Sequence, residues 1–163
     1  MLKTIRAKTF RAGAARFAIV ASHYNRRYVE AMVRAARAEL TRAGASSVLV
    51  VRVPGAYEIP LVTARLACSA ATGTPKPPLS AIICLGVILR GETVHAAHIG
   101  EAVSRALMEI QLRFEIPVVH EVLLLENEAQ AQARCLSKTH NRGTEAAQTA
   151  LAMAKVMRAI SAG

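Results

Sequence analysis

The segment most able to do chemistry runs from Gly86 to His95 and follows a short apolar run. Gly91 permits close approach of the backbone, and we expect the N–H groups of Gly91, Glu92 and Thr93 to point outward where a helix starts. Such N–H donors suit an anion, above all phosphate. His95 lies two residues further on, where a histidine can move protons near neutral pH. A purely structural histidine is the alternative.

Two other segments carry polar or aromatic groups directly after apolar runs. Tyr24 can offer an aromatic face to a planar ligand, and Asn25 can start a helix. Glu58 follows a turn at Pro54 and Gly55, and from the first turn of a helix it can accept hydrogen bonds from ligand hydroxyls. The alternatives are a helix cap beside a half-buried tyrosine, and a carboxylate that only complements the helix dipole.

Basic side chains follow the fourth apolar run. Arg134 and Arg142 can clamp a phosphate, although a single arginine is more often a solvated surface residue. Three other kinds of site are excluded by missing motifs. The chain has no GxxxxGK[ST] loop for nucleotide phosphates, no GxGxxG after a strand for a dinucleotide, and no GxSxG elbow for a serine nucleophile. His95 and His98 lack the carboxylates of a known metal triad, so we expect no metal.

The elements that must position these residues are four strands alternating with helices. The apolar runs predict strands over Phe17–Ala21, Val48–Val53, Ala81–Leu85 and Pro117–Leu125. Helical periodicity predicts helices over Val29–Leu40, Ile59–Ala71, Ile99–Phe114 and Ala147–Met157, a short helix over Glu128–Arg134, and caps for the last helix within Thr144–Gln148. This alternation predicts a doubly wound parallel α/β sheet, in which ligands bind beyond the carboxyl ends of the strands.

Composition restricts the class of protein further. The 163 residues suit one domain, with residues 1–15 as an N-terminal arm or an extra edge strand around Leu2–Thr9. A hydrophobic content of 53% excludes disorder, and no apolar run is long enough to span a membrane. Three scattered cysteines and the lack of a signal-peptide pattern indicate a reduced, cytoplasmic protein. The net charge of +10 suggests nucleic acid, but the basic residues are spread out and no aromatic-rich basic strand occurs.

Three blocks of sequence together resemble the 6,7-dimethyl-8-ribityllumazine synthase family. They are Val53–Pro60 (VPGAYEIP), Gly86–His95 (GVILRGETVH) and Asn141–Ala147 (NRGTEAA), and the likeness extends from about residue 16 to residue 157. The resemblance implies a three-layer, flavodoxin-like fold with a four-stranded parallel sheet flanked by helices.

The resemblance also implies an activity, the penultimate step of riboflavin biosynthesis. The family condenses 5-amino-6-ribitylaminopyrimidinedione with 3,4-dihydroxy-2-butanone 4-phosphate, releases phosphate and water, and uses neither cofactor nor metal. Its sites form between the subunits of a homopentamer. Twelve pentamers can assemble into a sixty-subunit icosahedral shell, and riboflavin synthase can be a partner.

Residue by residue, the resemblance implies catalysis by His95, oriented by Glu145. Tyr24 would stack on the pyrimidine, Glu58 would hold the ribityl chain, and Arg134 would pair with the phosphate. The full implied substrate-binding set is Tyr24, Asn25, Ala56, Tyr57, Glu58, Val87, Ile88, Leu89, Gly91, Glu92, Thr93, His120, Arg134 and Arg142.

The chain departs from the family's pattern at several positions. His120 stands where Phe is usual, on a neighbouring subunit's wall of the pyrimidine pocket. Glu121 replaces a common Gly, and Arg142 replaces a common Lys. No insertion separates Arg134 from Asn141, which favours the shell over free pentamers. The alternatives are a basic α/β module that binds nucleic acid or a flavin-like ligand, and a catalytically silent shell protein.

Overall fold

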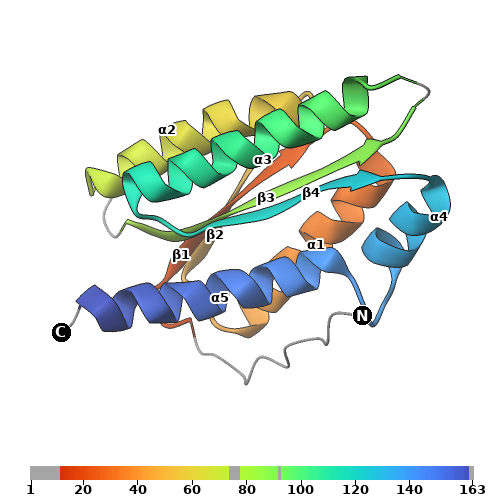
Figure 1. Ribbon diagram of the computed structural model, residues 1–163. Helices are drawn as coiled ribbons and strands as arrows, with labels where there is room; N and C mark the ends of the chain where they lie inside the picture. Colours follow the sequence, from red (N-terminus) through yellow and green to blue (C-terminus); the bar gives the residue numbers. More distant parts are fainter. Residues whose placement is uncertain (1–11, 74–77, 92, 162–163) are drawn as a thin grey trace.

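Strands and helices alternate along the chain in a computed structural model that describes residues 12–73, 78–91 and 93–161 (Figure 1). The predicted extra strand around residues 2–9 lies outside this part of the chain. The elements are β1 (Arg16–Ser22), α1 (Arg26–Arg42), β2 (Ser47–Val53), the 3-10 turn η1 (Ala56–Glu58), α2 (Ile59–Ala71), β3 (Leu79–Leu89), α3 (His95–Phe114), β4 (Val118–Leu125), α4 (Glu128–Ala131), the π-helical turn η2 (Gln132–Leu136) and α5 (Arg142–Ser161).

The four strands form one parallel sheet in the order β2-β1-β3-β4. The central strands β1 and β3 are buried along almost their whole length, which explains their nearly continuous apolar sequences. From β1 the chain moves outward to β2 on one side and later returns to β3 on the other. The carboxyl ends of β1 and β3 therefore mark the point where ligands bind in folds of this kind.

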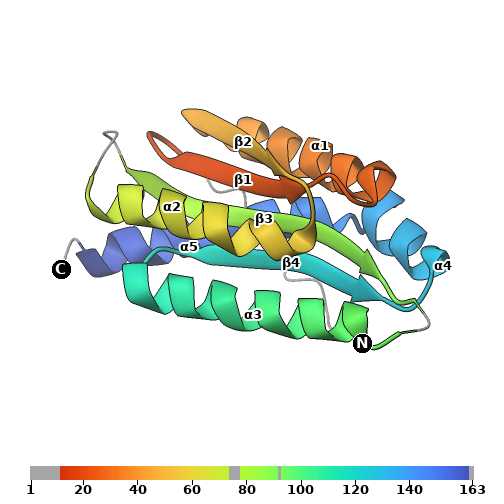
Figure 2. The ribbon, with the colours of Figure 1, turned by 90° about the horizontal axis from the view of Figure 1, so that it is seen from above.

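Two pairs of helices cover the sheet, so the predicted three-layer α/β fold is confirmed. Helices α2 and α3 lie on one face, and α1 and α5 lie on the other (Figures 1 and 2). Each pair closes its own apolar core, one around Phe17, Ile83 and Leu85 and the other around Val20, Ile82 and Ile59. The alternation of side chains along the strands divides the core between the two faces.

Several element boundaries differ from the sequence-based prediction, and two of the differences have a clear physical reason. We expected the third strand to end at Leu85, but β3 continues through Gly86 to Leu89. A Cβ on Gly86 would lie 3.1 Å from Val122 and 3.3 Å from Ile59, so this glycine serves close packing within the sheet rather than a turn. Helix α5 starts at Arg142 instead of being capped from Thr144 onward, because the Asn141 side chain accepts a hydrogen bond from the Gly143 N–H at 2.9 Å.

Candidate active site

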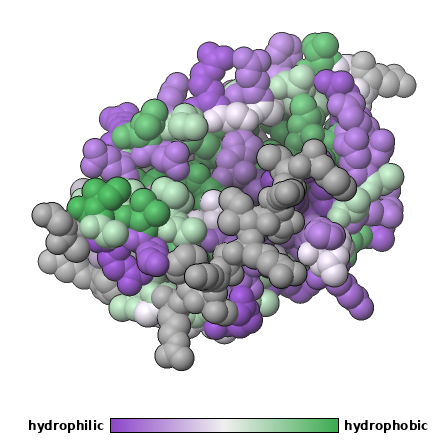
Figure 3. All heavy atoms as spheres, turned by 60° about the horizontal axis from the view of Figure 1, so that its bottom comes forward, coloured by the Kyte–Doolittle hydropathy of each residue, from purple (hydrophilic) through white to green (hydrophobic). Residues whose placement is uncertain are grey.

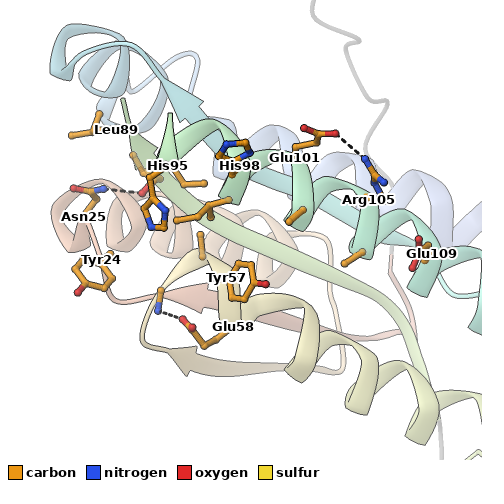
Figure 4. Close-up of a pocket in the computed structure, with 17 residues that line it drawn as sticks. Tyr24, Asn25, Tyr57, Glu58, Leu89, His95, His98, Glu101, Arg105 and Glu109 are labelled. Carbon is orange, nitrogen blue, oxygen red and sulfur yellow. Dashed lines mark hydrogen bonds and ion pairs between the residues drawn. The ribbon is translucent and has the colours of Figure 1, made fainter. Parts of the chain in front are cut away.

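A pocket of about 1070 Å³ opens on the α2/α3 side of the sheet and reaches the carboxyl ends of β1 and β3 (Figure 4). It is larger than a single small metabolite requires. Nine of the sequence-predicted site residues line it, namely Tyr24, Asn25, Ala56, Tyr57, Glu58, Val87, Ile88, Leu89 and His95. The fold therefore brings together segments that are up to 71 residues apart in the sequence, from Tyr24 to His95.

The turn after β1 is hydrogen-bonded to the neighbouring strand β3. Asn25 adopts the left-handed conformation (φ 55°) and its side chain does not cap α1. Instead, its Nδ2 donates a hydrogen bond to the backbone carbonyl of Val87 at 2.8 Å. Asn25 thus starts α1 as predicted, but the alternative in which its side chain caps the helix is wrong, because the side chain fastens the β1 turn to β3. Tyr24, expected to be half-buried if structural, is 72% exposed and faces the pocket.

The turn after β2 holds a carboxylate at the pocket. Glu58 ends the η1 turn, and its Oε2 accepts a hydrogen bond from the Gly55 N–H at 2.8 Å. A Cβ at Gly55 would lie 2.9 Å from that same oxygen, so a larger residue there would force the Glu58 carboxylate to shift. The Tyr24 N–H bonds to the Pro54 carbonyl at 3.1 Å, which links this turn to the end of β1. A carboxylate can accept more hydrogen bonds than this one, so Glu58 keeps acceptor capacity for a ligand.

Helix α3 forms a wall of the pocket that the sequence interpretation missed. His95 is its first residue, and six polar or small residues of the next turns also line the pocket, namely His98, Glu101, Ala102, Arg105, Ala106 and Glu109. Glu101 and Arg105 form an exposed ion pair at 2.8 Å. The sequence does contain a pattern that could have indicated this wall, because polar residues recur at spacings of three and four after His95. The same pattern is typical of an ordinary solvent-exposed helix face.

The proposed phosphate segment lies before the helix rather than at its start. Gly91 and Thr93 are exposed loop residues, and α3 begins only at His95. Glu92 lies outside the described residues. Neither Gly91 nor Thr93 lines the pocket, so phosphate binding by this segment stays a prediction.

A second group of predicted residues lies on other parts of the fold. Arg142 binds Glu121 through two hydrogen bonds of 2.9 and 3.0 Å, and it also binds Glu145 at 2.6 Å. Burial raises the pKa of the Glu121 carboxyl, and the charge of Arg142 only partly offsets this. Burial opposes the charge of Arg142, but the two carboxylates outweigh it and raise the arginine's pKa. This Arg142 cluster consists of Glu121, Arg142 and Glu145.

The Arg142 cluster does not contribute to the pocket of the same chain, and neither do Arg134 and His120. Glu145, expected to orient His95, bonds to Arg142 instead, and Arg134 is an exposed residue of η2. His120 lies on β4, where its ring contacts Ser104. The described residues of one chain thus form a pocket with nine predicted site residues, while His120, Arg134, Arg142 and Glu145 line no part of it.

Two features are absent from the part of the chain that the structure describes. No group of three or more His, Cys, Asp or Glu side chains in these ranges is arranged to hold a metal ion. No helix in the same ranges combines the length and the apolar character needed to cross a membrane.

Comparison with known proteins identifies relatives of the whole fold. Residues 14–158 match the family model described as 6,7-dimethyl-8-ribityllumazine synthase. A protein of that name from Stenotrophomonas maltophilia (strain R551-3) is 39% identical over 146 residues, which cover 88% of this chain and 90% of the relative. One from Xanthomonas euvesicatoria pv. vesicatoria (strain 85-10) is 39% identical over 145 residues, with the same coverage. The chain therefore belongs to the 6,7-dimethyl-8-ribityllumazine synthase family.

Proposed function

We propose that the chain condenses 5-amino-6-ribitylaminopyrimidinedione with 3,4-dihydroxy-2-butanone 4-phosphate to form 6,7-dimethyl-8-ribityllumazine, the penultimate step of riboflavin biosynthesis. The observation that carries the proposal is the pocket at the carboxyl ends of β1 and β3. There Tyr24, Glu58 and His95 come together from three separate segments of the chain. In this pocket an aromatic ring, a hydroxyl acceptor and a proton carrier are provided at once, as the two substrates require.

The chemistry suits a site that positions two substrates. An imine forms, phosphate is eliminated, and the ring closes with loss of water. Each step moves a proton, and His95 at the pocket wall can give and take it near neutral pH. Holding both substrates in one pocket of about 1070 Å³ supplies most of the acceleration, because it replaces a collision in solution by a fixed arrangement.

We further propose that the site is completed by a second copy of the chain, in a homopentamer. The reason is that the described residues of one chain offer the pocket no guanidinium other than Arg105, whose partner is Glu101. The exposed Arg134 of a neighbouring copy would supply the phosphate clamp, and Glu145 of that copy would orient His95. Assembly of pentamers into an icosahedral shell, with riboflavin synthase as a partner, extends the same proposal.

The proposed location is the cytoplasm. Cys68, Cys84 and Cys135 are all free thiols, as expected in a reducing compartment.

The test is formation of the lumazine from the two purified substrates, followed by its absorbance. His95→Ala should lower kcat by roughly 10²-fold or more, because it removes the proton carrier. Arg134→Ala should lower kcat/KM for the butanone phosphate by about 10- to 100-fold, the size of a lost charge-assisted hydrogen bond.

The matched control is Arg37→Ala, which removes an exposed arginine of α1 that lines no part of the pocket. Its kinetics should equal those of the wild type. No product from the wild type would overturn the enzyme proposal and favour a binding module or a silent shell protein. Unchanged kinetics in Arg134→Ala would overturn only the phosphate clamp.

A further inference from the structure

The ring of His120 is held by hydrogen bonds at both of its nitrogens. Its Nδ1 lies 3.2 Å from the backbone nitrogen of Val122, and its Nε2 lies 2.8 Å from the Ser104 Oγ. The Ser104 hydroxyl in turn donates to the backbone carbonyl of Gly100 at 2.7 Å. The chain of contacts therefore runs from β4 through the histidine ring into α3.

The donors and acceptors of this chain admit one arrangement of protons. A backbone N–H can only donate, so the His120 Nδ1 must accept and carries no proton. The Ser104 proton is already used on Gly100, so Ser104 Oγ accepts from the His120 Nε2–H. All the contacts are satisfied only when His120 is neutral and its single proton is on Nε2.

The same arrangement excludes a serine nucleophile activated by histidine. A general base would need a lone pair on the nitrogen that faces the serine, and here Nε2 carries the proton. Ser104 and His120 are therefore a structural pair rather than the start of a hydrolytic triad.

The surroundings of His120 favour the neutral ring. His120 is an exposed residue of β4, but the partial burial of its ring still lowers its pKa, because the charged form loses hydration. Opposite it on β3 is Cys84, whose pKa burial raises to about 12, so that thiol stays uncharged. On α3, Glu101 and Arg105 flank Ser104 and pair with each other at 2.8 Å.

We propose that Ser104 is a positioning residue, which holds His120 as the neutral Nε2–H tautomer so that its ring offers a flat, uncharged face to the pyrimidine bound by a neighbouring copy. The proposal rests on the proposed function, in which a second copy completes the pocket, and it adds His120 of β4 to the residues which that copy supplies. A neutral ring can stack on a neutral heterocycle, whereas a freely rotating or protonated imidazole would be hydrated and badly oriented.

The first measurement is the state of His120 itself, by ¹⁵N NMR of the full-length protein from about pH 6 to pH 8. We expect a single neutral Nε2–H tautomer in the wild type and a mixture of tautomers in Ser104→Ala. Ser104→Thr keeps a hydroxyl and should restore the single tautomer. An Nδ1–H tautomer or a protonated ring in the wild type at pH 8 would overturn the proposal.

The second measurement is the affinity for the ribitylaminopyrimidine alone, by calorimetry on the assembled protein. Ser104→Ala should raise its Kd by about 3- to 10-fold, as expected for one lost hydrogen bond, while kcat with both substrates stays close to that of the wild type. Ser104→Thr should bind as the wild type does. The decisive comparison uses a protein that already carries His120→Phe. Adding Ser104→Ala to this variant should not change its Kd.

These measurements distinguish a failure of this proposal from a failure of the proposed function. A wild type that binds the pyrimidine without making lumazine would overturn the proposed function, while the Kd series would still decide the role of Ser104. An equal effect of Ser104→Ala in the wild-type and His120→Phe backgrounds would overturn the positioning role even in an active enzyme.

Discussion

The two helical layers of this protein differ in how completely they are packed. On the α1/α5 side, Ala146, Ala147 and Ala150 are fully buried, and a Cβ on Gly143 would lie 2.0 Å from the Met32 carbonyl oxygen. Small residues thus let α5 lie directly against the backbone of α1. Viewed from below this side, hydrophilic residues separate the hydrophobic groups on the surface (Figure 3).

The α2/α3 side, in contrast, leaves a pocket of about 1070 Å³ open at the carboxyl ends of β1 and β3. Leu61 is 76% exposed and Leu112 is 70% exposed, although both belong to helices that pack well on the sheet. On the other side, Ile160 near the end of α5 is 69% exposed. The comparison teaches that the two sides differ in how closely the helix backbones approach each other and in the pocket, which opens on the α2/α3 side.

The largest expected effect tests the packed layer. Gly143→Ala should lower the free energy of unfolding by at least about 3 kcal/mol, because the new methyl group meets the backbone of Met32, which cannot rotate away. The measurement is chemical denaturation at fixed protein concentration.

The matched control lies in the open layer. Gly100 is inside α3, and its Cβ would meet only the Leu124 side chain, at 3.6 Å. Gly100→Ala should therefore stabilise the protein by about 0.5–1 kcal/mol, through the better helix propensity of alanine. Equal effects of the two substitutions would break the contrast between the layers.

A smaller effect is expected at the open apolar surface. Leu112→Glu should weaken self-association by about tenfold or more, since a charge would be buried in the contact between copies. Val156→Glu on α5, which replaces a 46% exposed side chain, should leave the assembly unchanged. Sedimentation or light scattering measures both, and dissociation by Val156→Glu alone would move the interface to the other layer.

The smallest effect concerns the buried acid on the packed side. Because burial raises the pKa of Glu121, the folded protein keeps this proton to a higher pH than the unfolded chain does. Its contribution to stability is complete below its ordinary value of 4.5 and is lost as the pH rises through the folded value. The wild type should therefore lose stability relative to Glu121→Gln as the pH rises from about 4.5 toward neutral.

Denaturation curves at several pH values measure this difference. Glu101→Gln, which removes one partner of an exposed pair on α3, should change the unfolding free energy by less than about 0.5 kcal/mol at every pH. A wild type that gains stability over Glu121→Gln with rising pH would show that Arg142 outweighs burial.

Most of the fold could be predicted from local sequence signals. The helix over Ile59–Ala71 was predicted with its observed bounds, and the first two strands to within one residue. The predicted end of β3 at Leu85 was wrong, because a glycine within an apolar run does not by itself show whether a strand continues. Only the closeness of Val122 and Ile59 reveals the packing role of Gly86. A glycine's reason for being at a position depends on neighbours that are distant in sequence.

The sequence by itself determined the parallel α/β sheet, the residues of its strands and the chemical groups at the strand ends, since periodicity and residue type are local properties. Only the tertiary structure decided which of those groups share a pocket. It gathered Tyr24, Glu58 and His95, turned the Asn25 side chain to Val87, and engaged Glu145 with Arg142. Side-chain partners depend on how the helices and the sheet pack together. The spacing of residues along the chain does not specify the distance between side chains on different elements.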